Sequence, residues 1–248
     1  MAAKAATVRL PWADGRDNVS RDMAAQVDHT DRLVIFDLDG TLYDSRTSFV
    51  PTMRAVYEEY GLEYPTDSII MRSVGEPFPV FLNWLIEHGF QGDRDALAGR
   101  ISEIELASIR TRGKLFPGVL ETLATLRSSG YSISLCTNGD MQYAQAVLST
   151  CDILDLFDEL RTNEVEGTTK TELVRDLLLH VPHERAFMVG DRHHDMQAGR
   201  ANGCIVIAAA YGYGSPEELE GADRRINSFS EISAALDASA GEPPATHS

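Results

Sequence analysis

Two aspartates separated by one residue follow a short apolar run in this chain. Asp37 and Asp39 lie in residues 37–41 (DLDGT), directly behind residues 33–36 (LVIF). The apolar run is rich in β-branched residues, which is typical of a strand buried on both faces of a parallel sheet. The two carboxylates would point the same way, but the turn at Gly40 lets the backbone peel away. One carboxylate can then attack while its neighbour handles protons.

Polar residues follow later apolar runs as well. Ligands of open parallel sheets bind beyond the carboxyl ends of the strands, so these positions are the ones to compare. Thr137 and Asn138, with the amides after them, offer neutral donors to a phosphoryl oxygen. Lys170 would supply a fixed positive charge. Asp191, followed by Asp195, adds a hard oxygen ligand of the kind Mg²⁺ accepts. Together these residues predict a single anion and metal site.

The pattern of apolar residues indicates the scaffold that would position this site. From residue 115 onward, strand and helix patterns alternate, which predicts an α/β fold with a doubly wound, Rossmann-like parallel sheet. The stretch before it is helical, with Leu97, Ile101 and Ile104 at helical spacing, and too long for a simple crossover. It is therefore expected to be an inserted all-helical cap domain. The expected strands are residues 33–36, 132–137, 159–161, 186–189 and 204–209, followed by short helical segments.

These patterns divide the chain into a core, a cap and two ends. Residues 32–44 and 115–237 are expected to form the catalytic core, and residues 45–114 the helical cap. Residues 1–31 and 238–248 are polar and lack sustained periodicity, so both ends are expected to be mobile.

The overall composition narrows the class of protein. The 248 residues are 43% hydrophobic and 24% charged, as in ordinary globular proteins, and no apolar run is long enough to cross a bilayer. The net charge of −16 argues against nucleic acid and anionic membranes as partners. Three cysteines are too few for a disulfide framework, and the first residues lack the pattern of a secretory signal. We therefore expect a cytoplasmic protein, either a monomer or a homodimer.

With these motifs in this order, the sequence resembles the haloacid dehalogenase superfamily, in its phosphatase branch with a helical C1-type cap. The resemblance spans roughly residues 33–237. The first motif of that family is Asp-x-Asp-x-Thr, which Asp37, Asp39 and Thr41 fill. The resemblance implies that Asp37 is the nucleophile that becomes an aspartyl-phosphate, and that Asp39 is the general acid and then the base.

The remaining motifs of the family also have counterparts. Thr137 fits the second motif, Lys170 the third, and Asp191 with Asp195 the fourth. The resemblance implies Mg²⁺ held by the Asp37 carboxylate, the Asp39 backbone carbonyl and Asp191, with Asp195 orienting water or the lysine. The implied activity is hydrolysis of a small phosphorylated metabolite. Residues 190–195 and 211–215 look like those of phosphoglycolate phosphatase-like and nucleotidase-like members.

Other functions fit the same core. A phosphomutase would use the same motifs and return the phosphoryl group to its substrate, so it is the alternative enzyme. A non-catalytic binding protein on this fold is disfavoured because all four motifs are intact. Asp39 argues against a dehalogenase, since cleavage of a carbon–halogen bond needs no protonated leaving oxygen.

Three further features have both a functional and a structural interpretation. His193 and His194 are expected to be solvated rather than zinc ligands, because no cysteine or glutamate lies at ligand spacing. Residues 73–79 break the helical pattern and are either a specificity loop above the active site or a plain turn between helices. Arg72, beside them, is expected at the surface rather than on the substrate.

Overall fold

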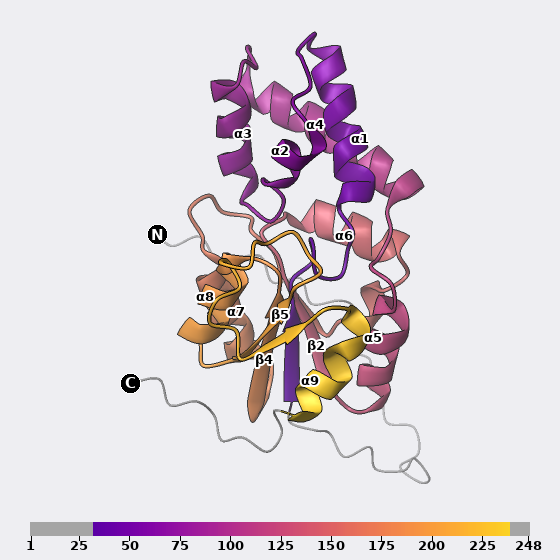
Figure 1. Cartoon of the computed structure of the whole chain (residues 1–248), viewed down its shortest axis with the longest axis vertical. Coiled ribbons are helices and arrows are strands. Elements are labelled where there is room, and N and C mark those ends of the chain that lie inside the picture. Colours follow the sequence, from indigo (N-terminus) through magenta and orange to yellow (C-terminus); the bar gives the residue numbers. More distant parts are fainter. Residues whose placement is uncertain (1–31, 239–248) are drawn as a thin grey trace.

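A six-stranded parallel sheet forms the centre of the computed structural model, which describes residues 32–238 (Figure 1). The strand order is β3-β2-β1-β4-β5-β6, and every neighbouring pair is parallel. This arrangement confirms the predicted α/β class. The expectations for residues 1–31 and 239–248 lie outside the described residues. The strands are β1 (Arg32–Phe36), β2 (Ser132–Cys136), β3 (Glu159–Arg161), β4 (Arg185–Gly190), β5 (Ile205–Ala209) and β6 (Arg224–Ile226).

Helices cover both faces of the sheet, and the side chains of β1 divide between them. Val34 and Phe36 pack in a cluster with residues of α5 and α9, whereas Leu33 and Ile35 pack with residues of α7. All four side chains are fully buried, as the unbroken apolar run predicts for a central parallel strand. The helices of this part are α5 (Val119–Ser128), α6 (Met141–Thr150), α7 (Lys170–His180), α8 (His193–Ala201) and α9 (Ile232–Ala238), with short 3₁₀ turns at Leu154–Leu156 and Phe229–Glu231.

Four helices between β1 and α5 form a separate layer above the sheet (Figure 1). They are packed around their own apolar cluster, which includes Met53, Ile70 and Leu85. Leu97 and Ile101 are buried as their spacing predicts, and Ile104 is half-buried. The helices are α1 (Arg46–Glu59), α2 (Asp67–Met71), α3 (Phe78–Glu87) and α4 (Arg94–Arg112), and we call them the helical insertion.

The two connections between the helical insertion and the sheet run side by side. Tyr43 forms an antiparallel bridge with Leu115. Around it, Asp44 N donates to Lys114 O and Phe116 N donates to Leu42 O, both at 2.9 Å. The insertion is therefore attached through a paired, hydrogen-bonded ribbon rather than through two independent linkers.

The edge strand β6 was not expected from the sequence, which indicated only short helical segments after residue 209. β6 pairs with β5 through Arg224 opposite Ile207. It has only three residues, two of them arginines, so neither an apolar run nor an alternating pattern marks it. Among residues 32–238, no helix combines the length and apolar character needed to span a bilayer.

Candidate active site

The parallel register brings the residues after β1, β2 and β4 to one edge of the sheet. Phe36 pairs with Leu135 of β2 and with Val189 of β4. Asp37 N then donates to Val189 O at 2.9 Å. Because adjacent parallel strands end together, Asp37 lies between the polar segments that follow β2 and β4.

A buried lysine lies between two carboxylates at this edge. Lys170 Nζ is 2.5 Å from Asp37 Oδ1 and 2.6 Å from Asp195 Oδ1. Lys170 is the first residue of α7, whose start is fixed by a capping box between Thr169 and Glu172. Burial by itself would lower the pKa of Lys170, but Asp195 and Asp37 raise it above its usual range. The ammonium group is therefore held protonated next to Asp37.

Three buried carboxylates meet beside this lysine. Each of Asp37, Asp191 and Asp195 offers an oxygen, and these oxygens lie within 4.8 Å of one another. Burial raises the pKa of Asp37, against the lowering effect of Lys170, and Asp195 and Asp191 raise it further. Burial and Asp195 likewise raise the pKa of Asp191. This crowding of carboxylates makes ionisation costly without a further cation.

Two glycines, Gly40 and Gly212, approach Asp191 so closely that neither position has room for a side chain. A Cβ at Gly40 would lie 2.2 Å from Asp191 Oδ2, and one at Gly212 would lie 2.4 Å from Asp191 Cβ. Tyr213 N donates to Asp191 Oδ2 at 2.6 Å, which fixes the carboxylate. The grouped side chains offer only carboxylate oxygens, which are the ligands a hard divalent cation prefers, so the residues fit a metal site. We call the close packing of Gly40 and Gly212 around Asp191 the glycine cradle.

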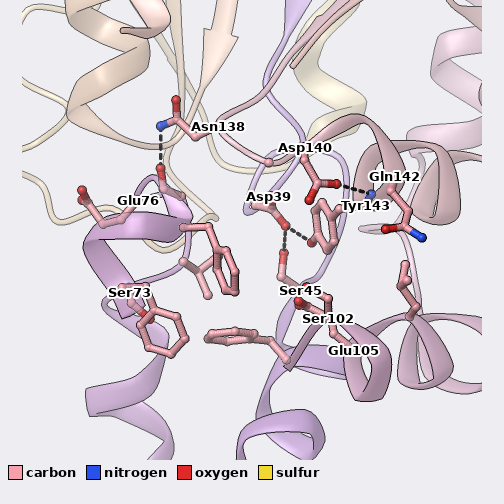
Figure 2. A pocket seen from close by; sticks show the side chains of 17 residues that line it. Asp39, Ser45, Ser73, Glu76, Ser102, Glu105, Asn138, Asp140, Gln142 and Tyr143 are labelled. Carbon is pink, nitrogen blue, oxygen red and sulfur yellow. Dashed lines mark hydrogen bonds between the residues drawn. The ribbon is translucent and has the colours of Figure 1, made fainter. Parts of the chain in front are cut away.

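The second aspartate of the first motif has different partners. Ser45 Oγ and Tyr143 Oη each donate a hydrogen bond of 2.5 Å to Asp39 Oδ1 (Figure 2). Burial raises the pKa of Asp39, and the two hydrogen bonds lower it only in part. Asp37 and Asp39 therefore differ in their partners, since one is paired with a cation and the other with two hydroxyls. Neither Ser45, before α1, nor Tyr143, on α6, was identified from the sequence.

The residues after β2 connect the sheet to the helical insertion. Thr137 is buried, and its Oγ1 accepts from Gly139 N at 3.1 Å. The Asn138 side chain donates to Gly75 O at 2.8 Å (Figure 2). The side-chain amide of Asn138, predicted to bind phosphate, is thus engaged with the insertion.

A second contact holds residues 73–79 over the site. The Arg192 guanidinium donates to the backbone carbonyl of Val74 and forms salt bridges with Glu76 at 3.1 Å and Glu218 at 2.7 Å. Residues 72–77 form the turn between α2 and α3. Together with the bond from Asn138, these contacts hold that turn against the residues that follow β2 and β4. Arg72 is exposed, as expected.

The two histidines after Arg192 have partners that the sequence did not reveal. His194 Nε2 is 3.2 Å from Glu76 Oε2, a residue 118 positions earlier. His193 Nδ1 is 3.1 Å from Glu218 Oε2, although the histidine side chain is 48% exposed. His193 is thus exposed, as expected, and His194 is half-buried. Their glutamate partners lie far away in the sequence, so spacing along the chain could not reveal them.

A pocket lies between the helical insertion and the edge of the sheet (Figure 2). Asp39, in the segment after β1, and Ser45, before α1, both line it. Its walls come from the insertion, through Phe49, residues 73–76, Phe78, Phe81, Ser102, Glu105 and Leu106, and from residues 138–140, Gln142 and Tyr143.

Comparison with known proteins identifies the family of this fold and site. Residues 34–209 match the family model of haloacid dehalogenase-like hydrolases, so the chain belongs to that family. The chain is 26% identical over 209 residues to a protein named "Probable phosphatase IndB" from Dickeya dadantii, covering 81% of this chain and 91% of that protein. It is 27% identical over 199 residues to a phosphoglycolate phosphatase from Haemophilus influenzae, covering 73% and 87%.

A solved structure extends the likeness to the fold. A haloacid dehalogenase-like hydrolase from Streptococcus pneumoniae, SP0104, superposes with a TM-score of 0.72 at 25% identity, covering 82% of this chain and 97% of that one. The predicted family resemblance and its fold are thereby confirmed.

Proposed function

We propose that this chain hydrolyses a small phosphate monoester through an aspartyl-phosphate on Asp37. The phosphatase class itself, predicted from the sequence, agrees with the family match and with the names of its relatives. The observation that carries the assignment of roles is the contrast between Asp37, beside Lys170, and Asp39, beside Ser45 and Tyr143.

In the first step, an oxygen of Asp37 forms a bond to phosphorus while the ester P–O bond breaks. Lys170 offsets charge on the attacking carboxylate and on the phosphoryl oxygens. Asp39 gives its proton to the leaving oxygen, and burial raises its pKa, which is the direction that favours the protonated acid. Thr137 and the amides after it would donate to the phosphoryl oxygens.

In the second step, water attacks phosphorus and loses a proton to Asp39, while the bond to Asp37 breaks and phosphate is released. Asp39 can serve both steps because Ser45 and Tyr143 fix its carboxylate. Asp37, Asp191 and the backbone carbonyl of Asp39 would hold Mg²⁺, with Asp195 behind them, and the ion would neutralise phosphoryl oxygens.

The helical insertion, proposed to be a cap of residues 45–114, would exclude bulk water from a core of residues 32–44 and 115–237. A cytoplasmic location, a monomeric or dimeric state and the absence of nucleic-acid and membrane partners stay predictions of the sequence. The phosphomutase remains the alternative enzyme, and it would need a bisphosphate activator and yield an isomer.

The test measures phosphate release from a panel of phosphate monoesters, including phenyl phosphate, with Mg²⁺ and with a chelator. We expect release that depends on the metal and falls by about 10³-fold or more in Asp37→Asn. Asp155→Asn, the same change at an exposed position outside the site, is the control and should keep full activity. Absence of metal-dependent release from every ester would overturn the proposed function.

A further inference from the structure

The pocket above Asp39 is acidic, although its substrate must carry a phosphate. Four of its lining residues are carboxylic acids, namely Asp39, Glu76, Glu105 and Asp140, and no lysine, arginine or histidine lines it within the described part of the chain. A leaving group with its own negative charge would therefore meet acids and no cation in this pocket.

Only one of these four acids has no partner. Asp39 accepts from two hydroxyls, Glu76 pairs with Arg192, and Asp140 caps the start of α6. The side chain of Glu105, by contrast, has no hydrogen-bond or salt-bridge partner among residues 32–238, and only burial and nearby charges shift its pKa. Its carboxyl group is therefore available to a substrate.

Glu105 lies close to the reacting end of the pocket. It is on α4 beside Ser102, and Figure 2 shows both next to Ser45, which bonds Asp39. Burial, and then the charges of Asp39 and Asp140, raise the pKa of Glu105 to about 8. At neutral pH the group can donate a hydrogen bond as the neutral acid, or ionise when a cation approaches. In neither form does it carry a positive charge that would offset the charge of an anion.

The remaining wall of the pocket is aromatic. Phe49, Phe78 and Phe81 all line it, and the rings of Phe49 and Phe81 have their centroids 5.4 Å apart. Such a wall favours a leaving group that is flat and apolar over one that is small and hydrated. Burying apolar surface is favourable, whereas burying an unpaired charge is not.

We propose that Glu105 and this aromatic wall select phosphate monoesters whose leaving group has a flat apolar body and no negative charge. Carboxylated leaving groups, such as that of the phosphoglycolate in the name of one relative, would be disfavoured here. The inference rests on the proposed phosphatase function and names the substrate class of the same site.

The experiment compares three phenyl phosphates that differ only at the end of the para substituent: 2-hydroxyethyl, 2-aminoethyl and carboxymethyl. At least one methylene separates every polar end group from the ring, so the leaving oxygens stay similar. In wild type we expect kcat/KM for the hydroxyl and amine compounds to exceed that for the carboxylate by about tenfold or more. Glu105→Lys should reverse the preference toward the carboxylate, and Glu105→Gln should abolish any advantage of the amine over the hydroxyl.

Glu58→Lys is the matched control, because Glu58 is exposed on α1 and the substitution changes the net charge equally. It should leave the ratios among the three compounds as in wild type. Equal kcat/KM for the three compounds in wild type would overturn the inference even if the variants do not fold, and so would the same shift in Glu58→Lys as in Glu105→Lys. Failure of wild type to hydrolyse any of them, or phenyl phosphate, would instead overturn the proposed phosphatase function.

Discussion

The phenol of Tyr143 donates a hydrogen bond of 2.5 Å to Asp39, which lies 104 residues earlier in the chain. Burial raises the pKa of Tyr143 well above its usual range, and the charge of Asp39 raises it further. The phenol therefore keeps its proton and acts as a fixed donor. This bond links α6 to the first motif and, with Ser45, sets the direction of the carboxylate.

Removing this donor should change the pH dependence of the reaction. The hydrogen bond lowers the pKa of Asp39, so Tyr143→Phe should raise that pKa further. The alkaline limb of kcat/KM for phenyl phosphate, which reports loss of the general acid, should move to higher pH, and the rate should fall about tenfold. Tyr60→Phe, in a tyrosine whose ring packs on Phe90 in the insertion, is the control. An unmoved alkaline limb in Tyr143→Phe would contradict this role for Asp39.

Lys170 should be required for stability as well as for activity. Lys170→Met leaves Asp37 and Asp195 buried without their cation, and breaking such a pair costs about 3–5 kcal/mol. Burial raises the folded-state pKa of Asp37, so the penalty for ionising it is present above that pKa and is relieved as pH falls. Urea unfolding should therefore show that Lys170→Met lowers the free energy of unfolding strongly at pH 8 and less at pH 5. A loss independent of pH would count against the buried pair.

Gly40 and Gly61 offer a matched test of the cradle around Asp191. Both have positive φ, 80° and 65°, so an alanine is strained at either position by about 1–2 kcal/mol. Only at Gly40 would the added Cβ also collide with Asp191, because nothing lies within 4 Å of the corresponding position at Gly61. Gly40→Ala should abolish stabilisation by Mg²⁺ in thermal unfolding, whereas Gly61→Ala should retain it. Equal responses to Mg²⁺ would remove the case for the cradle.

Arg192 should hold residues 73–79 in place over the pocket. Arg192→Met removes its salt bridges to Glu76 and Glu218 and its bond to the Val74 carbonyl. We expect KM for phenyl phosphate to rise about tenfold, with a smaller change in kcat. Arg54→Met, which breaks an exposed ion pair with Asp67, is the control and should change neither, since exposed pairs contribute little.

Features that depend on residues close together in the sequence could be predicted from it. The buried strand at residues 33–36 and the polar residues behind it were predictable because an apolar run marks β1 and parallel strands end together. Ser45, Tyr143, Glu76 and Glu105 were not, because their roles depend on how the helical insertion packs against the sheet. The partner of His194 was missed for the same reason.

The ribbon that joins the insertion to the sheet restricts how the pocket can open. Twisting the two connections apart would break the bridge between Tyr43 and Leu115 and the hydrogen bonds beside it, whereas bending both together would keep them. The insertion is thus left with one easy degree of freedom, a swing about an axis across the ribbon. Any such swing that opens the pocket would also have to break the contacts of Asn138 and Arg192 with residues 74–76.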